Sequence, residues 1–263
     1  MRVGVYQFPG SADIQRNHET IKTAVINAAA NQVRVLVFQE CAACGYPPVE
    51  TPEIKEIDYK KLDEYFVEIK QLAKKNGMFI ALGTVRKENS KYYNSIKLIN
   101  PEGEVAGSYD KRALWGWDTD NFTKGEDMGI FDIDGIRMGF RICFEVRFPE
   151  YFRELFKSKA ELCFVSFCDV SAQDYPARYD IIKAHLVTRA VENIMTVISV
   201  NSISEYQTAP TAVIDSNGLV VSEAPKNREY LLVYDHSTPA VDFGAKGRIV
   251  NSIQLLEPDV ENR

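Results

Sequence analysis

Residues 135–150 read GIRMGFRICFEVRFPE, a pattern that predicts a strand leading into a helix. Apolar side chains recur at every second position from residue 136 to residue 142, which is the period of a half-buried strand. Pro149 is typical of the first position of a helix. The turn between the two elements should hold its side chains rigidly and present one of them above the edge of the sheet.

Cys143 lies on this turn, and its role has two interpretations. A nucleophile needs such a rigid, projecting position, and the helix N-terminus and basic residues nearby favour a thiolate over a thiol. A free cysteine, however, is more often a small buried hydrophobe. The chain has five cysteines, an odd number, so in a reducing compartment we expect free thiols and reactivity in at least one of them.

The rest of the chain alternates strand and helix patterns, which is typical of an α/β protein. Residues 33–38 (VRVLVF) are nearly all apolar, as in a strand buried on both faces. Helical spacing of apolar residues predicts one helix over residues 13–31 and another from about Asp58 to Asn76. Later patterns predict a helix over 179–193 and strands over 162–167, 194–200 and 229–234.

Hairpin turns recur along the chain and give its two halves a similar pattern. Asp134-Gly135 and Asn217-Gly218 are two-residue turn signals between apolar runs. The segments around residues 100–107 and 214–221 look alike, which is a weak hint of an internal duplication. No linker divides the chain, so we predict a single domain over residues 1–263. A tail from about residue 238 should run over the surface or pack on a partner subunit.

Glu40 follows the most buried of the predicted strands, in the stretch VLVFQE. The carboxyl ends of central strands are where α/β proteins usually place their active sites. Partial burial there would raise the pKa of a carboxyl group, which suits a general base near neutral pH. A solvated acid at a strand end, or a helix cap, is the alternative interpretation.

Lys111 follows the first hairpin, in GSYDKRALWGW, among bulky aromatic residues. A lysine in such surroundings could be a buried cation with a role in the chemistry. Lysines at the ends of hairpins are more often exposed, so both interpretations stay open at this residue.

Taken together, these stretches resemble the nitrilase superfamily of carbon–nitrogen hydrolases, in its amidase-like branch. In that family the corresponding positions hold a glutamate, a lysine and a nucleophilic cysteine, which are here Glu40, Lys111 and Cys143. The resemblance covers residues 3 to about 235. Three stretches occur in the order and spacing of the family: FQECAACGYPP (38–48), YDKRALWGW (109–117) and ICFEVRFPE (142–150).

The resemblance implies a four-layer α-β-β-α sandwich that pairs into homodimers or larger homo-oligomers. It also implies hydrolysis of a non-peptide carbon–nitrogen bond in a small molecule, with no metal or organic cofactor. Cys143 would attack an amide carbonyl or nitrile carbon, and Glu40 would move the protons. Lys111 and the backbone N–H of Phe144 would stabilise the oxyanion.

The preferred substrate under this resemblance is a small amide. Hydrolysis of a nitrile or an N-carbamoyl compound at the same site is the alternative within the family. A catalytically silent relative that serves as a binding or scaffold subunit is the alternative from another functional class.

One departure from the family pattern concerns a second glutamate that members commonly carry soon after the lysine. The corresponding segment, WGWDTDNFTKG, has no glutamate before Glu126. Asp118 is the best replacement and Asp120 is the second, although either could be a solvated loop acid. Because aspartate is one methylene shorter than glutamate, the backbone would have to bring it closer.

Three aromatic and two acidic residues are candidates for the substrate pocket: Tyr46, Trp115, Phe167, Glu145 and Asp169. The aromatic candidates would line the pocket, and core or interface packing is the alternative for at least half of them. Glu145, close to the nucleophile, could select a cationic or amide-bearing substrate.

Other motifs indicate different chemistry less strongly. Cys41-Ala42-Ala43-Cys44 has the C-x-x-C spacing of redox and zinc sites, but the sequence has no second ligand pair and its three histidines are scattered. His185 could pair with a cysteine in a papain-like scheme, although a structural role is commoner for such a histidine. We therefore predict no metal site.

Composition and charge limit the partners of the chain. The formal net charge is -6, so we expect no general attraction to nucleic acid or anionic lipid. The N-terminus lacks the apolar region of a signal peptide, and no run approaches the roughly 20 apolar residues that span a bilayer. We predict a cytoplasmic enzyme without nucleic-acid or membrane partners.

Overall fold

The computed structural model describes residues 1–263 apart from 48, 52, 239–240 and 257–263. Its two main sheets have six strands each. The first sheet has the order β14-β1-β2-β3-β4-β5 and comprises β1 (Arg2–Gln7), β2 (Val35–Phe38), β3 (Phe79–Glu88), β4 (Lys91–Ile99), β5 (Val105–Asp110) and β14 (Tyr230–Asp235). The second has the order β13-β12-β10-β8-β7-β6 and comprises β6 (Ile130–Ile133), β7 (Ile136–Ile142), β8 (Leu162–Phe167), β10 (Thr196–Asn201), β12 (Ala212–Ile214) and β13 (Val220–Glu223).

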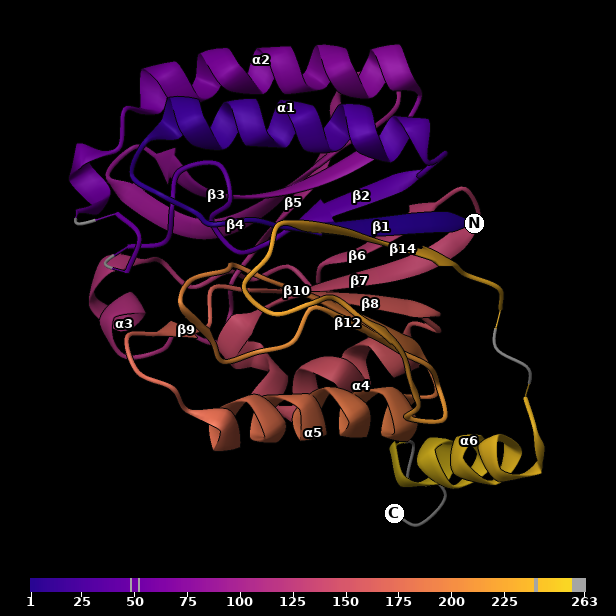
Figure 1. Cartoon of the computed structure of the whole chain (residues 1–263). Helices are drawn as coiled ribbons and strands as arrows, with labels where there is room; N and C mark the ends of the chain where they lie inside the picture. Colours follow the sequence, from indigo (N-terminus) through magenta and orange to yellow (C-terminus); the bar gives the residue numbers. More distant parts are fainter. Residues whose placement is uncertain (48, 52, 239–240, 257–263) are drawn as a thin grey trace.

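Helices cover the outer face of each sheet (Figure 1). The first sheet is covered by α1 (Ile14–Ala30) and α2 (Tyr59–Asn76), and the second by α4 (Pro149–Lys157) and α5 (Pro176–Asn193). The remaining elements are η1 (Ile54–Glu56), α3 (Trp117–Asn121), η2 (Cys143–Arg147), the paired β9 (Val170–Ser171) and β11 (Tyr206–Gln207), and α6 (Phe243–Leu256).

Three separate apolar clusters fill the spaces between the four layers. One includes Val25 and Ile69 and lies between the first sheet and its helices. A second includes Val5 and Phe140 and lies between the two sheets. The third, around Leu186, lies between the second sheet and α4 and α5. Burial of these faces is the main force that holds the layers together. The four-layer α-β-β-α sandwich that the resemblance implies is confirmed.

The two sheets repeat one strand arrangement. In each, three parallel strands (β1-β2-β3 and β7-β8-β10) continue into antiparallel strands, β4-β5 and β12-β13. The turns of these two hairpins lie in the segments at 100–107 and 214–221, which look alike in the sequence. The internal likeness therefore corresponds to a repeated topology.

Local signals set the helix boundaries. The side chain of Asp13 accepts hydrogen bonds from the backbone N–H groups of Gln15 and Arg16 and begins α1. Gly77 has a φ of 60°, the left-handed conformation that ends α2. Helix α5 begins at Pro176 rather than near residue 179, because proline suits the first position of a helix.

The carboxyl ends of the central strands meet across the two sheets. The backbone N–H of Glu40 donates to the carbonyl of Phe167 at 3.3 Å. The Ser166 hydroxyl donates to the carbonyl of Phe38 at 2.9 Å. These contacts join the end of β2 to the end of β8, so the loops that follow both strands lie next to each other.

The C-terminal part contains α6, a helix that the sequence patterns do not predict. Ala245 is its one buried residue, whereas Phe243 and Leu255 are 93% and 81% exposed. Two parts of the predicted tail, 239–240 and 257–263, lie outside the described residues. None of the described helices is long and apolar enough to cross a bilayer.

Candidate active site

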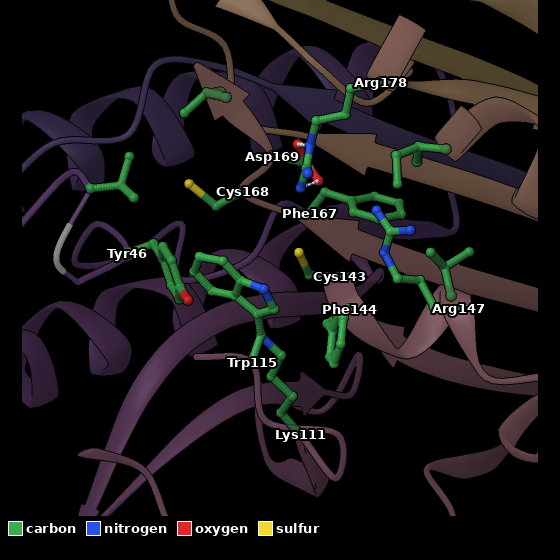
Figure 2. A pocket seen from close by; sticks show the side chains of 14 residues that line it. Tyr46, Lys111, Trp115, Cys143, Phe144, Arg147, Phe167, Cys168, Asp169 and Arg178 are labelled. Atoms are coloured by element: carbon green, nitrogen blue, oxygen red, sulfur yellow. Dashed lines mark hydrogen bonds and ion pairs between the residues drawn. The ribbon is translucent and has the colours of Figure 1, made fainter. Parts of the chain in front are cut away.

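A cavity of about 330 Å³ opens where loops of the two sheets meet. In Figure 2, Cys143 faces the middle of this cavity, with Tyr46 and Trp115 on one side and Asp169 and Arg178 on the other. The cavity is lined by Tyr46, Val49, Lys111, Trp115, Cys143, Phe144, Val146, Arg147, Phe167, Cys168, Asp169, Val170, Arg178 and Ile182.

Cys143 lies directly after β7 and begins η2. Its φ is 48°, a left-handed conformation that costs a non-glycine residue about 1–3 kcal/mol. Its side chain is partly exposed and lines the cavity. The strand-to-helix turn predicted from the alternation of residues 136–142 therefore presents this thiol to the cavity.

Glu40 lies on the loop after β2 and is almost completely buried. Its Oε1 accepts hydrogen bonds from Lys111 Nζ at 2.8 Å and from Asn94 Nδ2 at 2.7 Å. Its Oε2 accepts one from the backbone N–H of Cys168 at 2.9 Å. Three donors from different strands and loops therefore fix this carboxylate in one orientation.

Lys111 follows β5, and its side chain is only 1% exposed. Its ammonium lies between two carboxylates, 2.8 Å from Glu40 Oε1 and 2.7 Å from Asp118 Oδ2. The Tyr46 hydroxyl donates to Asp118 Oδ1 at 2.7 Å. A buried ammonium needs such partners, because an unpaired charge away from water is very costly.

The buried charges alter each other's protonation. Burial raises the pKa of Glu40 above its ordinary value of 4.5, while Lys111 opposes this shift and Asp118 adds to it. Burial alone would lower the pKa of Lys111, but the charges of Glu40, Cys143 and Asp118 outweigh burial and raise it well above 10.5. Lys111 is therefore a permanent cation, whereas Glu40 is better suited than an ordinary carboxyl to exchange protons near neutral pH.

The Cys143 thiol has a raised pKa, which corrects the expectation of a thiolate. Burial raises this pKa well above 9.0, the charge of Glu40 raises it further, and Lys111 opposes these effects. A base that takes the thiol proton would therefore help Cys143 to act as a nucleophile.

Four of the five predicted pocket residues line the cavity: Tyr46, Trp115, Phe167 and Asp169. Trp115 is 54% exposed at the mouth, and the other three are buried. Asp169 pairs with Arg178, with Nε–Oδ1 and Nη2–Oδ2 distances of 2.7 and 2.8 Å.

Glu145 is not among the described residues that line the cavity, which corrects its prediction as a substrate selector. Its side chain is completely buried. Its Oε1 accepts from the backbone N–H of Arg112 at 2.7 Å, and its Oε2 accepts from the N–H of Ile142 at 2.6 Å. Arg112 follows Lys111 and Ile142 precedes Cys143, so this carboxylate ties the lysine segment to the cysteine turn.

The two candidates for the second acidic residue lie in different places. Asp118 is fully buried on α3 and contacts the ammonium of Lys111. Asp120, on the same short helix, is exposed, which corrects its place as the second candidate. Helix α3 brings Asp118 close enough to reach the lysine with the shorter side chain.

Three contributors to the site are absent from the sequence-based prediction: Asn94, Cys168 and Arg178. Asn94 is a polar residue on β4 whose role depends on a neighbour from another strand. Cys168 contributes its backbone N–H, which no side-chain pattern reveals. Arg178 could have been considered from its place two residues after Pro176, at the start of a helix that reaches the sheet edge.

The residues of the alternative motifs are not among those that line the cavity. Cys41 and Cys44 are buried free thiols. Within the described ranges, no three histidine, cysteine or acidic side chains are grouped so as to hold a metal ion. His185 lies on α5 and is not one of the residues that line the cavity.

Comparison with known proteins gives consistent matches. A sequence model of the carbon–nitrogen hydrolase family matches residues 2–242. The chain is 29% identical over 215 residues to 2-oxoglutaramate amidase of Bacillus subtilis (strain 168), covering 78% of this chain and 80% of that protein. It is 30% identical over 244 residues to a Staphylococcus aureus protein named "hydrolase in agr operon", covering 89% and 90%.

Solved structures share the fold. An amidase from Nesterenkonia sp. matches with a TM-score of 0.79 and 22% identity over 90% of each chain. A mutant of the amidase from Nesterenkonia sp. AN1, with acrylamide added at its active site cysteine, matches with a TM-score of 0.80 and 22% identity over 90% of this chain and 93% of that one. These structures confirm the fold, and the family match over residues 2–242 confirms the family that the three motifs indicate: the protein belongs to the carbon–nitrogen hydrolase family.

Proposed function

We propose that the protein hydrolyses the carbon–nitrogen bond of a small linear amide through a thioester on Cys143. One observation carries this proposal: Glu40, Lys111 and Asp118, which we call the floor cluster, lie buried beside the cavity that Cys143 lines. Burying three ionisable groups costs free energy. Such groups are concentrated at functional sites, where perturbed pKa values are used.

Acylation needs a base, because burial raises the pKa of the Cys143 thiol. Glu40 takes the thiol proton as the sulfur attacks the carbonyl carbon and forms a carbon–sulfur bond. The tetrahedral intermediate collapses when Glu40 returns this proton to the nitrogen. The carbon–nitrogen bond then breaks, ammonia or an amine leaves, and a thioester remains on Cys143.

Deacylation uses the same carboxylate. Glu40 takes a proton from water, whose oxygen attacks the thioester carbon. The carbon–sulfur bond breaks, the carboxylic acid leaves, and the proton returns to the sulfur. The raised pKa of Glu40 supports both roles, since the group must gain and lose a proton in each cycle.

Two donors stabilise the oxyanion that forms in each step. Lys111 supplies a permanent positive charge from the floor cluster, and the backbone N–H of Phe144 lies next to the nucleophile. Loss of one such donor typically lowers kcat by about 10²- to 10³-fold. Asp118 and Tyr46 hold the lysine in position through the hydrogen bonds described above.

The names of relatives favour an amide as the substrate. The relatives include 2-oxoglutaramate amidase of Bacillus subtilis and deaminated glutathione amidase of Dictyostelium discoideum, which is 25% identical over 252 residues. A nitrilase of Pyrococcus abyssi is also similar, at 28% identity over 150 residues. Nitrile and N-carbamoyl hydrolysis therefore remain the alternatives to test beside amides.

Ammonia release from a panel of small amides, nitriles and N-carbamoyl compounds tests the proposal. We expect release from at least one amide, and a fall of at least about 10³-fold in Cys143→Ala. Activity that survives this substitution would exclude Cys143 as the nucleophile. A protein that cleaves no compound of the panel, and in which mass spectrometry finds no acyl adduct on Cys143, would instead be a silent binding relative.

We also propose that the chain acts as one domain within a cytoplasmic homodimer or larger homo-oligomer. The exposed apolar residues Phe243, Val250 and Leu255 of α6 suit contact with a second copy. Five free cysteines suit a reducing compartment. Light scattering should give a multiple of the chain mass, and a version that ends at residue 242 should form an oligomer with fewer subunits. An unchanged number of subunits would exclude this role for α6.

A further inference from the structure

One wall of the cavity carries three charged side chains, Arg147, Asp169 and Arg178, which we call the wall cluster. They come from η2, from the loop after β8 and from α5. In the view of Figure 2 they lie on one side of Cys143, with Tyr46 and Trp115 on the other. A substrate whose amide reaches Cys143 therefore has charged groups on one side and aromatic rings on the other.

Asp169 has little capacity left for a ligand. Its two carboxylate oxygens accept from Arg178 Nε and Nη2 at 2.7 and 2.8 Å, and the Thr208 hydroxyl donates to Oδ1 as well. The backbone N–H of Asp169 donates to Asn201 Oδ1 at 2.8 Å, which fixes the loop. A cationic ligand would have to displace a bidentate, partly buried ion pair to reach this carboxylate.

The two guanidinium groups, by contrast, have donors to spare. A guanidinium carries five N–H donors, and the pair with Asp169 uses those on Nε and Nη2 of Arg178. Arg147 lines the cavity, and its side chain has no hydrogen bond or ion pair with any residue in the described part of the chain. The wall cluster therefore offers N–H donors and no free acceptor.

The charges of the two clusters also favour a negatively charged ligand at the wall cluster. In the floor cluster two carboxylates, those of Glu40 and Asp118, face the single ammonium of Lys111, so this cluster has no surplus positive charge to offer a ligand. In the wall cluster one carboxylate faces two guanidinium groups, so one positive charge is left over. The hydrogen bond and the charge of Asp169 raise the pKa of Arg178, so its guanidinium stays charged.

From the spare donors and the uncompensated charge of the wall cluster, we infer that the enzyme selects amides that also carry a carboxylate, such as the monoamides of short dicarboxylic acids. This inference rests on the proposed amide hydrolysis at Cys143. The carboxylate binds Arg147 and the remaining N–H groups of Arg178, while the amide lies at Cys143. A cavity of about 330 Å³ is at the lower end of ligand sites, which suits a chain of a few carbons.

Three amides of similar size test this selection through kcat/KM. Succinamic acid carries the carboxylate, 4-methylpentanamide replaces it with an isosteric apolar group, and 4-aminobutanamide replaces it with a cation. A charge-assisted hydrogen bond that the neutral amide cannot form should make succinamic acid the best of the three by about 10- to 100-fold.

Variants then assign the preference to the wall cluster. Arg147→Gln should lower the ratio of kcat/KM between succinamic acid and 4-methylpentanamide by at least about tenfold. Arg178→Gln should lower this ratio as well. Arg16→Gln removes the same charge from an exposed position on α1 and is the matched control, for which the ratio should not change.

Each outcome decides between the two proposals. Equal rates for charged and neutral amides, or a preference for 4-aminobutanamide, would overturn the inference and leave amide hydrolysis intact. If no amide is cleaved, calorimetry with succinamic acid and the Cys143→Ala protein separates the two. If succinamic acid binds and Arg147→Gln weakens this binding, the anion site is supported although the hydrolysis is not. If succinamic acid does not bind, the anion site is overturned.

Discussion

The floor cluster and the wall cluster satisfy their charges in different ways. In the floor cluster the side chains of Glu40, Lys111 and Asp118 are at most 1% exposed, and each carboxylate hydrogen-bonds the ammonium. In the wall cluster Asp169 is buried, but the Arg178 side chain is 40% exposed and Arg147 is only partly buried. A deeply buried charge needs a partner inside the protein, whereas a charge that lines the cavity can be solvated by water until a substrate group pairs with it.

This difference separates two kinds of effect. Changes in the floor cluster should alter the chemical step and the stability of the fold together, because the same contacts serve both. Changes at the mouth and wall of the cavity should alter substrate binding more than stability.

The largest effect should follow Glu40→Gln. The amide keeps the size of the side chain but cannot accept the thiol proton, so kcat should fall by about 10²- to 10⁴-fold. Steady-state kinetics with the amide identified above measure this loss. A fall of less than tenfold would mean that another group moves the protons.

Lys111→Met should cause the largest loss of stability. It leaves Glu40 and Asp118 buried side by side without their cation, so the free energy of unfolding should fall by about 3–5 kcal/mol. Urea denaturation measures the change. Lys183→Met removes a lysine from a partly exposed pair with Glu223 and should cost no more than about 1 kcal/mol. Equal losses in both variants would remove the distinction between buried and exposed pairs.

Asp118→Asn should shift the pH dependence of the reaction. The negative charge of Asp118 is one of the causes that raise the pKa of Glu40, so removing it makes the ionised form of Glu40 easier to reach. The acid limb of kcat/KM, which reports the base in the free enzyme, should therefore move to lower pH. A limb that stays in place, or moves to higher pH, would show that Asp118 does not act on Glu40 through its charge.

Trp115→Ala should have the smallest effect. The indole is 54% exposed at the mouth of the cavity and makes no side-chain hydrogen bond within the described ranges, so its loss removes contact area with the substrate. KM should rise several-fold, by a larger factor than kcat falls. A greater effect on kcat than on KM would mean that Trp115 helps to position the floor cluster.

The sequence predicts the fold and the floor cluster well for a physical reason. Strand and helix periods reflect burial, and three short motifs predict which residues follow β2, β5 and β7. The sequence could therefore predict that Glu40, Lys111 and Cys143 lie close together. Asp118 could be predicted because the family pattern has a glutamate in this segment, and the chain has aspartates there but no glutamate.

The wall cluster could not be predicted in the same way. The pair of Asp169 and Arg178 joins the loop after β8 to the first turn of α5, and no local pattern encodes that distance. The position of Glu145 was misjudged because its partners are backbone N–H groups of two distant segments. The pKa of Cys143 was misjudged because it depends on burial, which overcomes any nearby positive charge.

The most direct test of the thioester at Cys143 is the partition of products between water and hydroxylamine. Two amides with the same acyl group and different leaving amines should give carboxylic acid and hydroxamate in one common ratio, because both pass through the same thioester. Cys143→Ala should give no hydroxamate. A ratio that changes with the leaving amine, or hydrolysis without any hydroxamate at high hydroxylamine, would contradict a covalent intermediate on this cysteine.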